Sequence, residues 1–177
     1  MSTRLALQAG FTMIELMVTI AIIAIALALG VPYFNNATTG AKERGVIAKL
    51  QQDFAWARTA AGVSDANSLN VSGASGLPVI RVTMFSTAGS CDWTMSVNGH
   101  TDPAHSMTTA QLSSSTPGLS CPAGTGSSAL SQPVTFSFSS QGTVDKSGLQ
   151  TFHSSRGTDW PLIFMLSGTV LINQGLS

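Results

Sequence analysis

Residues 11–30 read FTMIELMVTIAIIAIALALG, an apolar run in which Glu15 is the single charged side chain. As an α-helix rising about 1.5 Å per residue, this run would reach roughly 30 Å, which is the thickness of the hydrocarbon core of a bilayer. We therefore expect residues 11–31 to form a helix able to cross a membrane. Arg4 is the only charge before the run, so the positive-inside rule predicts that it stays cytoplasmic while residues beyond Val31 do not.

Helical periodicity resumes after Pro32, whose ring removes a backbone donor and predicts a break in the helix. Over 32–62, apolar residues recur at spacings of three and four, while charged residues such as Asp53 fall mostly elsewhere on the helical wheel. The apolar positions are Ile47, Leu50, Phe54, Ala57 and Ala61. This pattern predicts an amphipathic helix that packs one face on a sheet.

Beyond Gly62 the pattern changes to short runs with strand character. These runs are 77–85, 93–97, 133–139, 149–153, 161–166 and 169–173. Ser167-Gly168, between the last two, predicts a tight hairpin turn. Residues 103–144 contain no Lys, Arg, Asp or Glu, and 15 of the 26 residues over 106–131 are Ser, Thr or Gly, which predicts a long polar loop there. A helix followed by many strands indicates an α+β fold with a β-rich head over 63–177.

Composition narrows the possible functions. The 177 residues suffice for one domain with a core. Eight Lys and Arg balance eight Asp and Glu, and charged residues make up only 9% of the chain, so bulk charge does not attract nucleic acid or anionic lipid. Cys91 and Cys121 lack the C-x-x-C spacing of zinc or thioredoxin-like sites, which leaves pairing or burial.

The segment Gly10-Phe11-Thr12-Met13-Ile14-Glu15-Leu16 resembles the type III signal of the type IV pilin and pseudopilin superfamily. In that superfamily a prepilin peptidase cuts after the glycine and methylates the new N-terminal phenylalanine. The resemblance implies cleavage after Gly10, N-methylation of Phe11 and a removable leader over 1–10. The apolar run is not followed by the small-residue cleavage pattern of a secretory signal, so we expect the helix to be kept.

Glu15 lies four residues after Phe11, so on a helix the two share a face about one turn apart. A charge deep in a membrane costs about 2.5–3.5 kcal/mol on insertion scales, so such an acid indicates a function with a partner. The resemblance implies that the partner is the terminal amine of a neighbouring subunit, which sets the axial register during assembly. Pairing with its own amine or extension to the membrane interface is the alternative. Pro32 resembles the proline at which many pilin stems kink or unwind in the filament.

The chain also resembles the GspH/FimT branch of the superfamily, which holds type II secretion pseudopilins and minor pilins. The residues that carry this resemblance are FAWARTAA at 54–61, Cys91-x-Trp93, VTFSFSSQG at 134–142 and a closing hairpin around Gly168. It implies a long N-terminal stem helix packed on an antiparallel β-sheet head. In the oxidising periplasm we expect Cys91 and Cys121 to form a disulfide, with two buried free thiols as the alternative.

Other chemistry finds little support in the sequence. His100, Asp102 and His105 would suit a transition metal, but on a loop they would need a fixed second shell, so we interpret them as solvated residues and expect no metal or cofactor. The sequence contains no G-x-S-x-G elbow, P-loop or paired carboxylates, and we expect no enzymatic activity.

Strong nucleic-acid binding is not expected either. Beyond the helix, three cations are opposed by five aspartates; they are Arg81, Lys146 and Arg156 against Asp65, Asp92, Asp102, Asp145 and Asp159. Trp93 and Trp160 could stack on single-stranded bases, although packing roles are the simpler interpretation. FimT proteins implicated in DNA uptake commonly end in a glycine–arginine-rich strand, which SGTVLINQG at 167–175 lacks.

Together these observations predict a structural minor pilin of a type IV pilus. It would be held in the bacterial inner membrane by one helix, with its head in the periplasm, and then assembled with other pilin subunits after processing by prepilin peptidase. The alternatives are an H-type pseudopilin of type II secretion, and a DNA-binding minor pilin in natural transformation, which would need clustered cations.

Overall fold

The computed structural model describes residues 11–62 and 79–173, without the side chains of 30–34 and 36. The chain divides into two compact units, Met1–Ala41 and Lys42–Ser177. The helix α1 spans Met13–Ala61 and so contributes to both units. It is helical without interruption at Pro32, so the break predicted there is absent.

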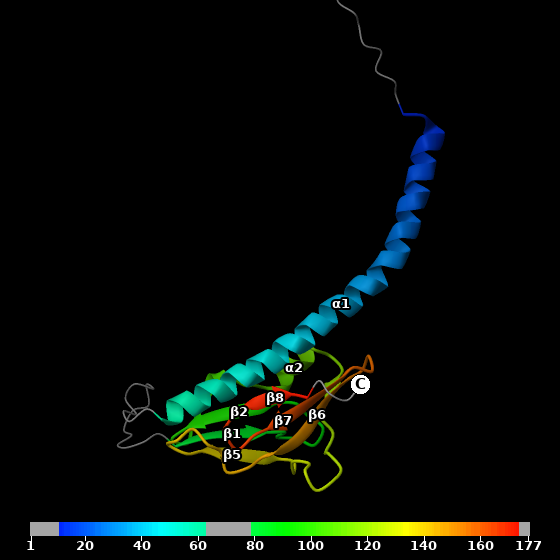
Figure 1. The fold of residues 1–177 in the computed structure, drawn as a ribbon. Coiled ribbons are helices and arrows are strands. Elements are labelled where there is room, and N and C mark those ends of the chain that lie inside the picture. Colours follow the sequence, from blue (N-terminus) through cyan, green and yellow to red (C-terminus); the bar gives the residue numbers. More distant parts are fainter. Residues whose placement is uncertain (1–10, 63–78, 174–177) are drawn as a thin grey trace, which may run out of the picture. The chain divides into compact units, whose positions relative to one another are not determined.

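The second unit contains two four-stranded antiparallel sheets (Figure 1). The first sheet has the order β3-β2-β1-β5, formed by β1 (Ile80–Met84), β2 (Trp93–Val97), β3 (His100–Met107) and β5 (Val134–Phe138). The second has the order β4-β6-β7-β8, formed by β4 (Leu119–Ser120), β6 (Gly148–Ser154), β7 (Asp159–Phe164) and β8 (Val170–Ile172). A short helix, α2 (Thr109–Ser115), follows β3.

The six strands predicted from short runs with strand character are present, as β1, β2, β5, β6, β7 and β8. The hairpin at Ser167-Gly168 is also present: Gly168 has a φ of 71° and its N–H donates to the carbonyl of Met165 at 2.9 Å. This left-handed conformation is one that glycine adopts without a steric penalty.

The long polar loop predicted over 106–131 is wrong in its first part, which contains the end of β3, α2 and β4. Strand β3 pairs with β2 through a two-residue turn in which Asn98 and Gly99 have φ values of 53° and 84°. Asn-Gly is the preferred sequence for such a turn. Helix α2 begins with a capping box between Thr108 and Gln111. Both signals are local, and neither depends on apolar alternation.

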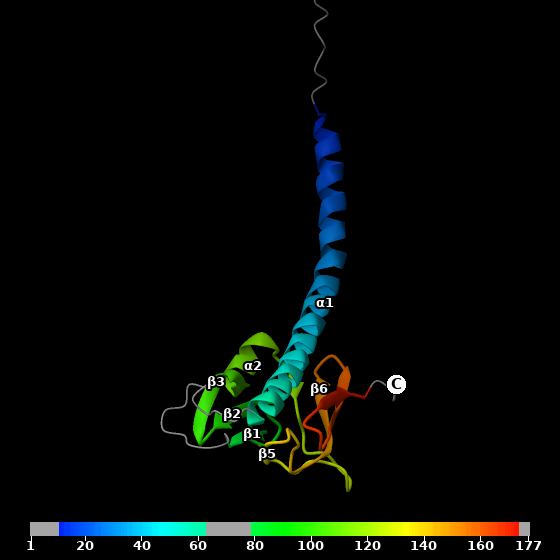
Figure 2. The same ribbon diagram turned by 60° about the vertical axis from the view of Figure 1, so that its left-hand side comes forward.

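The core forms where the last part of α1 lies over both sheets (Figures 1 and 2). The apolar face predicted for this part of the helix is buried as expected; it consists of Ile47, Leu50, Phe54, Ala57 and Ala61. The ring of Phe54 makes an edge contact with Phe136 of β5 at 5.4 Å and a tilted contact with Phe164 of β7 at 5.5 Å. One helix residue thus packs against both sheets, and the predicted α+β class, a helix packed on antiparallel sheet, is confirmed.

Candidate functional site

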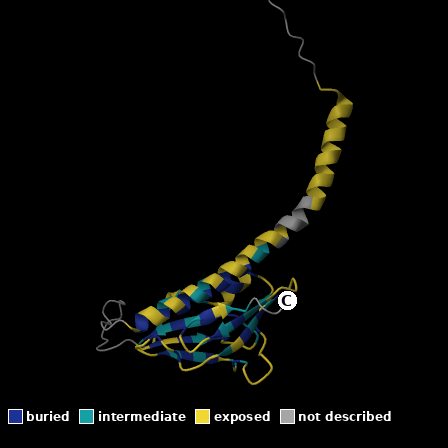
Figure 3. Ribbon diagram, viewed as in Figure 1, coloured by how far each residue is buried: buried dark blue, intermediate teal, exposed yellow. Residues whose placement is uncertain are grey.

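The first turns of α1 expose an apolar surface on every side (Figure 3). Phe11 is 78% exposed, and eleven further large apolar side chains up to Leu29 are exposed with it. A helix that is apolar all round is normally buried, and soluble monomers rarely expose contiguous apolar areas above a few hundred Å². This surface therefore requires an apolar cover that the chain itself does not provide within the described residues.

Across 11–62 and 79–173, no helix combines the length and the apolar character needed to cross a membrane. The membrane span predicted for residues 11–31 is therefore not confirmed.

Glu15 lies in the first turn of α1 and is exposed. Its backbone N–H donates to the carbonyl of Thr12 at 3.1 Å and to the Thr12 hydroxyl at 3.3 Å. Thr12 thus caps the helix, and a carboxylate in the first turn is favoured by the helix dipole. The spacing Thr12-x-x-Glu15 is itself a helix-start signal, one that the sequence analysis did not use. Glu15 therefore has a local role at the start of the helix in addition to the role in assembly that the sequence predicts.

For two other sequence-predicted residues of this segment, the structure describes no side chain. Gly10 lies outside the described residues, as does the whole leader over 1–10, and the side chain of Pro32 is not described. Their roles in cleavage and assembly stay predictions.

A buried carboxylate connects α1 to the first sheet. Asp53 is only 3% exposed, and its Oδ2 accepts hydrogen bonds from Nε1 of Trp93 at 2.8 Å and from Nζ of Lys49 at 2.7 Å. The same Nζ donates to the carbonyl of Ala104 in β3 at 3.1 Å. The helical wheel placed Asp53 away from the apolar face, and that expectation is wrong. The helix can bury this charge because two donors satisfy it.

A second buried carboxylate connects α1 to the other sheet. Glu43 is 2% exposed and accepts hydrogen bonds from Ser154 Oγ at 2.6 Å, Arg156 Nη2 at 3.0 Å and Trp160 Nε1 at 3.4 Å. Burial raises the pKa of Glu43, but the hydrogen bonds from Ser154 and Arg156 and the charge of Arg156 outweigh it, so the pKa lies below its ordinary value. Nothing in the local sequence identified this residue.

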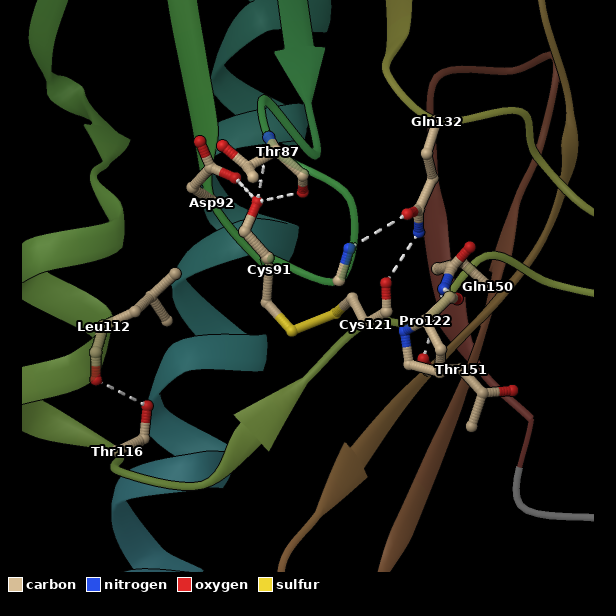
Figure 4. Close-up of a disulfide and its surroundings, with 12 residues drawn as sticks. Thr87, Cys91, Asp92, Leu112, Thr116, Cys121, Pro122, Gln132, Gln150 and Thr151 are labelled. Carbon is tan, nitrogen blue, oxygen red and sulfur yellow. Dashed lines mark hydrogen bonds between the residues drawn. A yellow bond between two sulfur atoms is a disulfide. The ribbon is translucent and has the colours of Figure 1, made fainter.

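The predicted disulfide between Cys91 and Cys121 is present, with the two Cα atoms 5.1 Å apart (Figure 4). Cys91 precedes β2 in the first sheet and Cys121 follows β4 in the second, so the bond joins the two sheets covalently. Gln132 reinforces this junction, because its amide donates to the Cys121 carbonyl at 2.7 Å and accepts from the Gly89 N–H at 3.4 Å. Both cysteines are in the disulfide, so this junction has a structural role and no reactive thiol.

The three candidate metal ligands lie on strand β3, not on the loop expected for them. Asp102 and His105 are brought together, with Oδ2 and Nδ1 2.7 Å apart, and the His105 ring stacks on Trp56 of α1 at 3.9 Å. Burial raises the pKa of Asp102, but hydrogen bonds from His105 and the Ala104 N–H outweigh it, so this pKa is lowered. Within the described ranges, no three His, Cys, Asp or Glu residues are grouped as metal ligands, so His100 does not complete a site.

Four of the residues considered for nucleic-acid binding make contacts within the fold. Trp93 is fully buried and Trp160 is half-buried, with the guanidinium of Arg44 5.8 Å from its ring. Arg156 pairs with Glu43, and Nζ of Lys146 donates to the carbonyl of Thr135 at 2.9 Å. The burial of Trp93 and the packing of Trp160 against the core agree with packing roles for both tryptophans.

A family model described as a prokaryotic N-terminal methylation motif matches residues 5–31. The match supports a type IV pilin-like protein of a pilus or pseudopilus, a structural and not an enzymatic class. It also implies a membrane-anchored precursor that is processed and then assembled with other pilin subunits. Searches of curated proteins and of solved structures found no match to the chain.

Proposed function

We propose that the chain is a structural minor subunit of a type IV pilus, of the GspH/FimT kind. The observation that carries this proposal is the exposed apolar helix surface of residues 11–29, which begins inside the methylation motif and contains one acid. In the precursor this surface would be covered by the inner membrane. In the filament it would be covered by the equivalent helices of neighbouring subunits.

The mechanism is assembly without turnover. Prepilin peptidase cuts after Gly10 and methylates Phe11, which creates a positive amine one turn before Glu15. The amine of a neighbouring subunit pairs with Glu15 and sets the axial register, since an acid placed among apolar helices is stable only when its charge is satisfied. The head over 63–177 then lies on the periplasmic side and becomes the outer part of the filament.

The test compares incorporation of three full-length chains into sheared filaments from cells with an active prepilin peptidase: wild type, Glu15→Val and Thr12→Ala. We expect Glu15→Val to be inserted and processed but to fall about tenfold or more in filaments, a difference of about 1.4 kcal/mol. Thr12→Ala removes the helix cap and keeps the carboxylate, so it should stay near the wild-type level.

The outcomes separate the two roles of Glu15. If Thr12→Ala falls as far as Glu15→Val, Glu15 acts by starting the helix and the assembly role is wrong. If the wild-type chain is absent from filaments of every kind, the proposed function is wrong. Recovery with type II secretion pseudopilins in place of pili would select the pseudopilin alternative.

A further inference from the structure

A groove with a cavity volume of about 510 Å³ lies at the end of α1, within the second unit. One wall is the last turns of the helix, with Ala55, Arg58 and Thr59, and the other includes Ser140 and Gln141 from the turn after β5. These five residues are exposed. The buried lining residues Gly142 and Gly168, from that turn and from the β7–β8 hairpin, form the deep part of the groove.

Gly142 leaves room for the side chain of Arg58, and Gly168 leaves room for the backbone of Gly142. A Cβ atom on Gly142 would lie 2.7 Å from Cγ of Arg58 and 3.2 Å from its carbonyl oxygen, and a Cβ on Gly168 would lie 2.6 Å from the carbonyl oxygen of Gly142. Both glycines also have left-handed φ values, 75° and 71°. The apolar stem of Arg58 therefore lies directly on backbone, and its position in the groove depends on the absence of side chains there.

Among the described residues that line the groove, Arg58 is the single charged one. Its guanidinium forms no ion pair or hydrogen bond with any residue in the described ranges, unlike Arg156 and Lys49. The planar guanidinium presents paired N–H donors that match the two oxygens of a carboxylate. The hydroxyl of Ser140 and the amide of Gln141 can add donors from the opposite wall.

We propose that this groove binds an acidic side chain, Asp or Glu, of a different subunit of the filament, with Arg58 holding its carboxylate. The inference rests on the proposed function, which places other subunits beside the head. Charge complementarity selects the occupant, because the described residues of the groove offer one unpaired cation and no acidic side chain. Its volume exceeds that of a carboxylate and admits a whole side chain with part of its backbone.

A simpler role for Arg58 also exists, since a cation in the last turn of a helix is stabilised by the helix dipole. That role needs no partner and predicts a different result. Replacement of Arg58 would then lower the thermal stability of the chain and leave its contacts in the filament unchanged.

The experiment uses the full-length Arg58→Lys variant in sheared filaments. The filaments are treated with a carbodiimide, which is a zero-length cross-linker. This reagent joins an amine to a carboxylate as an amide, only where the two groups touch, and it does not couple arginine. We expect a product, absent from wild type, that joins position 58 to an Asp or Glu of another filament subunit. The matched control is Gln52→Lys, an exposed helix residue outside the groove lining, which should give no such product.

A second measurement uses Arg58→Gln. We expect it to reduce the amount of the chain retained in filaments by about threefold to tenfold, while the thermal midpoint of the full-length protein stays within about 2 °C of wild type. Three results would overturn the inference while leaving the proposed function intact. Filaments that contain Arg58→Lys could give no intermolecular product, a product confined to one chain, or a product that joins two copies of this chain. Absence of the wild-type chain from filaments overturns both.

Discussion

Nε1 of Trp93 donates a 2.8 Å hydrogen bond to Oδ2 of Asp53, across 40 residues of sequence and inside the core. The bond joins the helix to the first sheet at a point where neither group reaches water. A buried donor that loses its acceptor costs about 1–3 kcal/mol, because its desolvation is no longer compensated.

Asp53→Ala is therefore expected to lower the free energy of unfolding by about 1–3 kcal/mol, and Asp53→Asn by less, because the amide oxygen can still accept. Urea unfolding of the full-length protein in detergent, followed by tryptophan fluorescence, measures the change. The control is Asp159→Ala, whose exposed pair with His153 should contribute within about 0.5 kcal/mol. Equal losses in the two alanine variants would contradict the anchoring role of Asp53.

The lowered pKa of Glu43 predicts how the stability of the protein depends on pH. The pKa of Glu43 is lowered in the folded state, so the unfolded chain binds a proton more readily than the folded chain. The ionised carboxylate therefore stabilises the fold above the ordinary pKa of about 4.5. This stabilisation is lost as the pH falls through the folded pKa. Glu43→Gln should unfold at a lower temperature than wild type at pH 7. The difference should shrink below about pH 4. A difference in thermal midpoint that is constant from pH 7 to pH 3 would refute this assignment.

The Cys91–Cys121 bond encloses a separation of 30 residues, for which the chain-entropy model predicts about 3–4 kcal/mol of stabilisation. Replacing both cysteines by alanine should lower the free energy of unfolding by about that amount. Thiol labelling of the unfolded protein without reductant should find no reactive cysteine in the wild type. Two labelled cysteines per chain would show that the bond does not form in the cell.

Processing predicts a defined N-terminus. Intact-mass analysis of membrane-extracted protein should give a chain that starts at Phe11 and carries one added methyl group. Gly10→Val should block the cut, because the peptidase must accept a residue without a side chain there. A wild-type species that retains residues 1–10 in cells with an active peptidase would exclude the processing step.

Duplex DNA should bind weakly at most, since Arg156 and Lys146 already make contacts within the head and Asp residues outnumber the cations there. A gel shift of the full-length protein at about 50 mM salt, where phosphate contacts are strongest, is expected to give a dissociation constant weaker than about 1 μM. Tighter binding that weakens steeply with salt would favour the DNA-uptake alternative over the structural one.

Much of this fold could be predicted because its signals are local. The three-and-four spacing from Ile47 to Ala61 identified the buried helix face, and short runs with strand character located six strands to within a few residues. Strand β3 and helix α2 were missed because their residues are mostly polar, and strand β4 because it has only two residues. Asn98-Gly99 and the Thr108–Gln111 capping box would have located the β2–β3 turn and the start of α2.

The sequence alone determined the N-terminal segment: its methylation motif, its apolar run and its single acid are all contained within adjacent residues, so no folding information was needed. The tertiary structure decided which charges are buried and which are free. Asp53 and Glu43 are acids on a mixed helix, and apart from Lys49 their donors lie 40 to 117 residues further along the chain. Among the described residues, Arg58 has no ion-pair or hydrogen-bond partner beside the two glycine turns. The burial of a charge depends on whether distant donors reach it, and only the packing of the two sheets on the helix brings those donors into range.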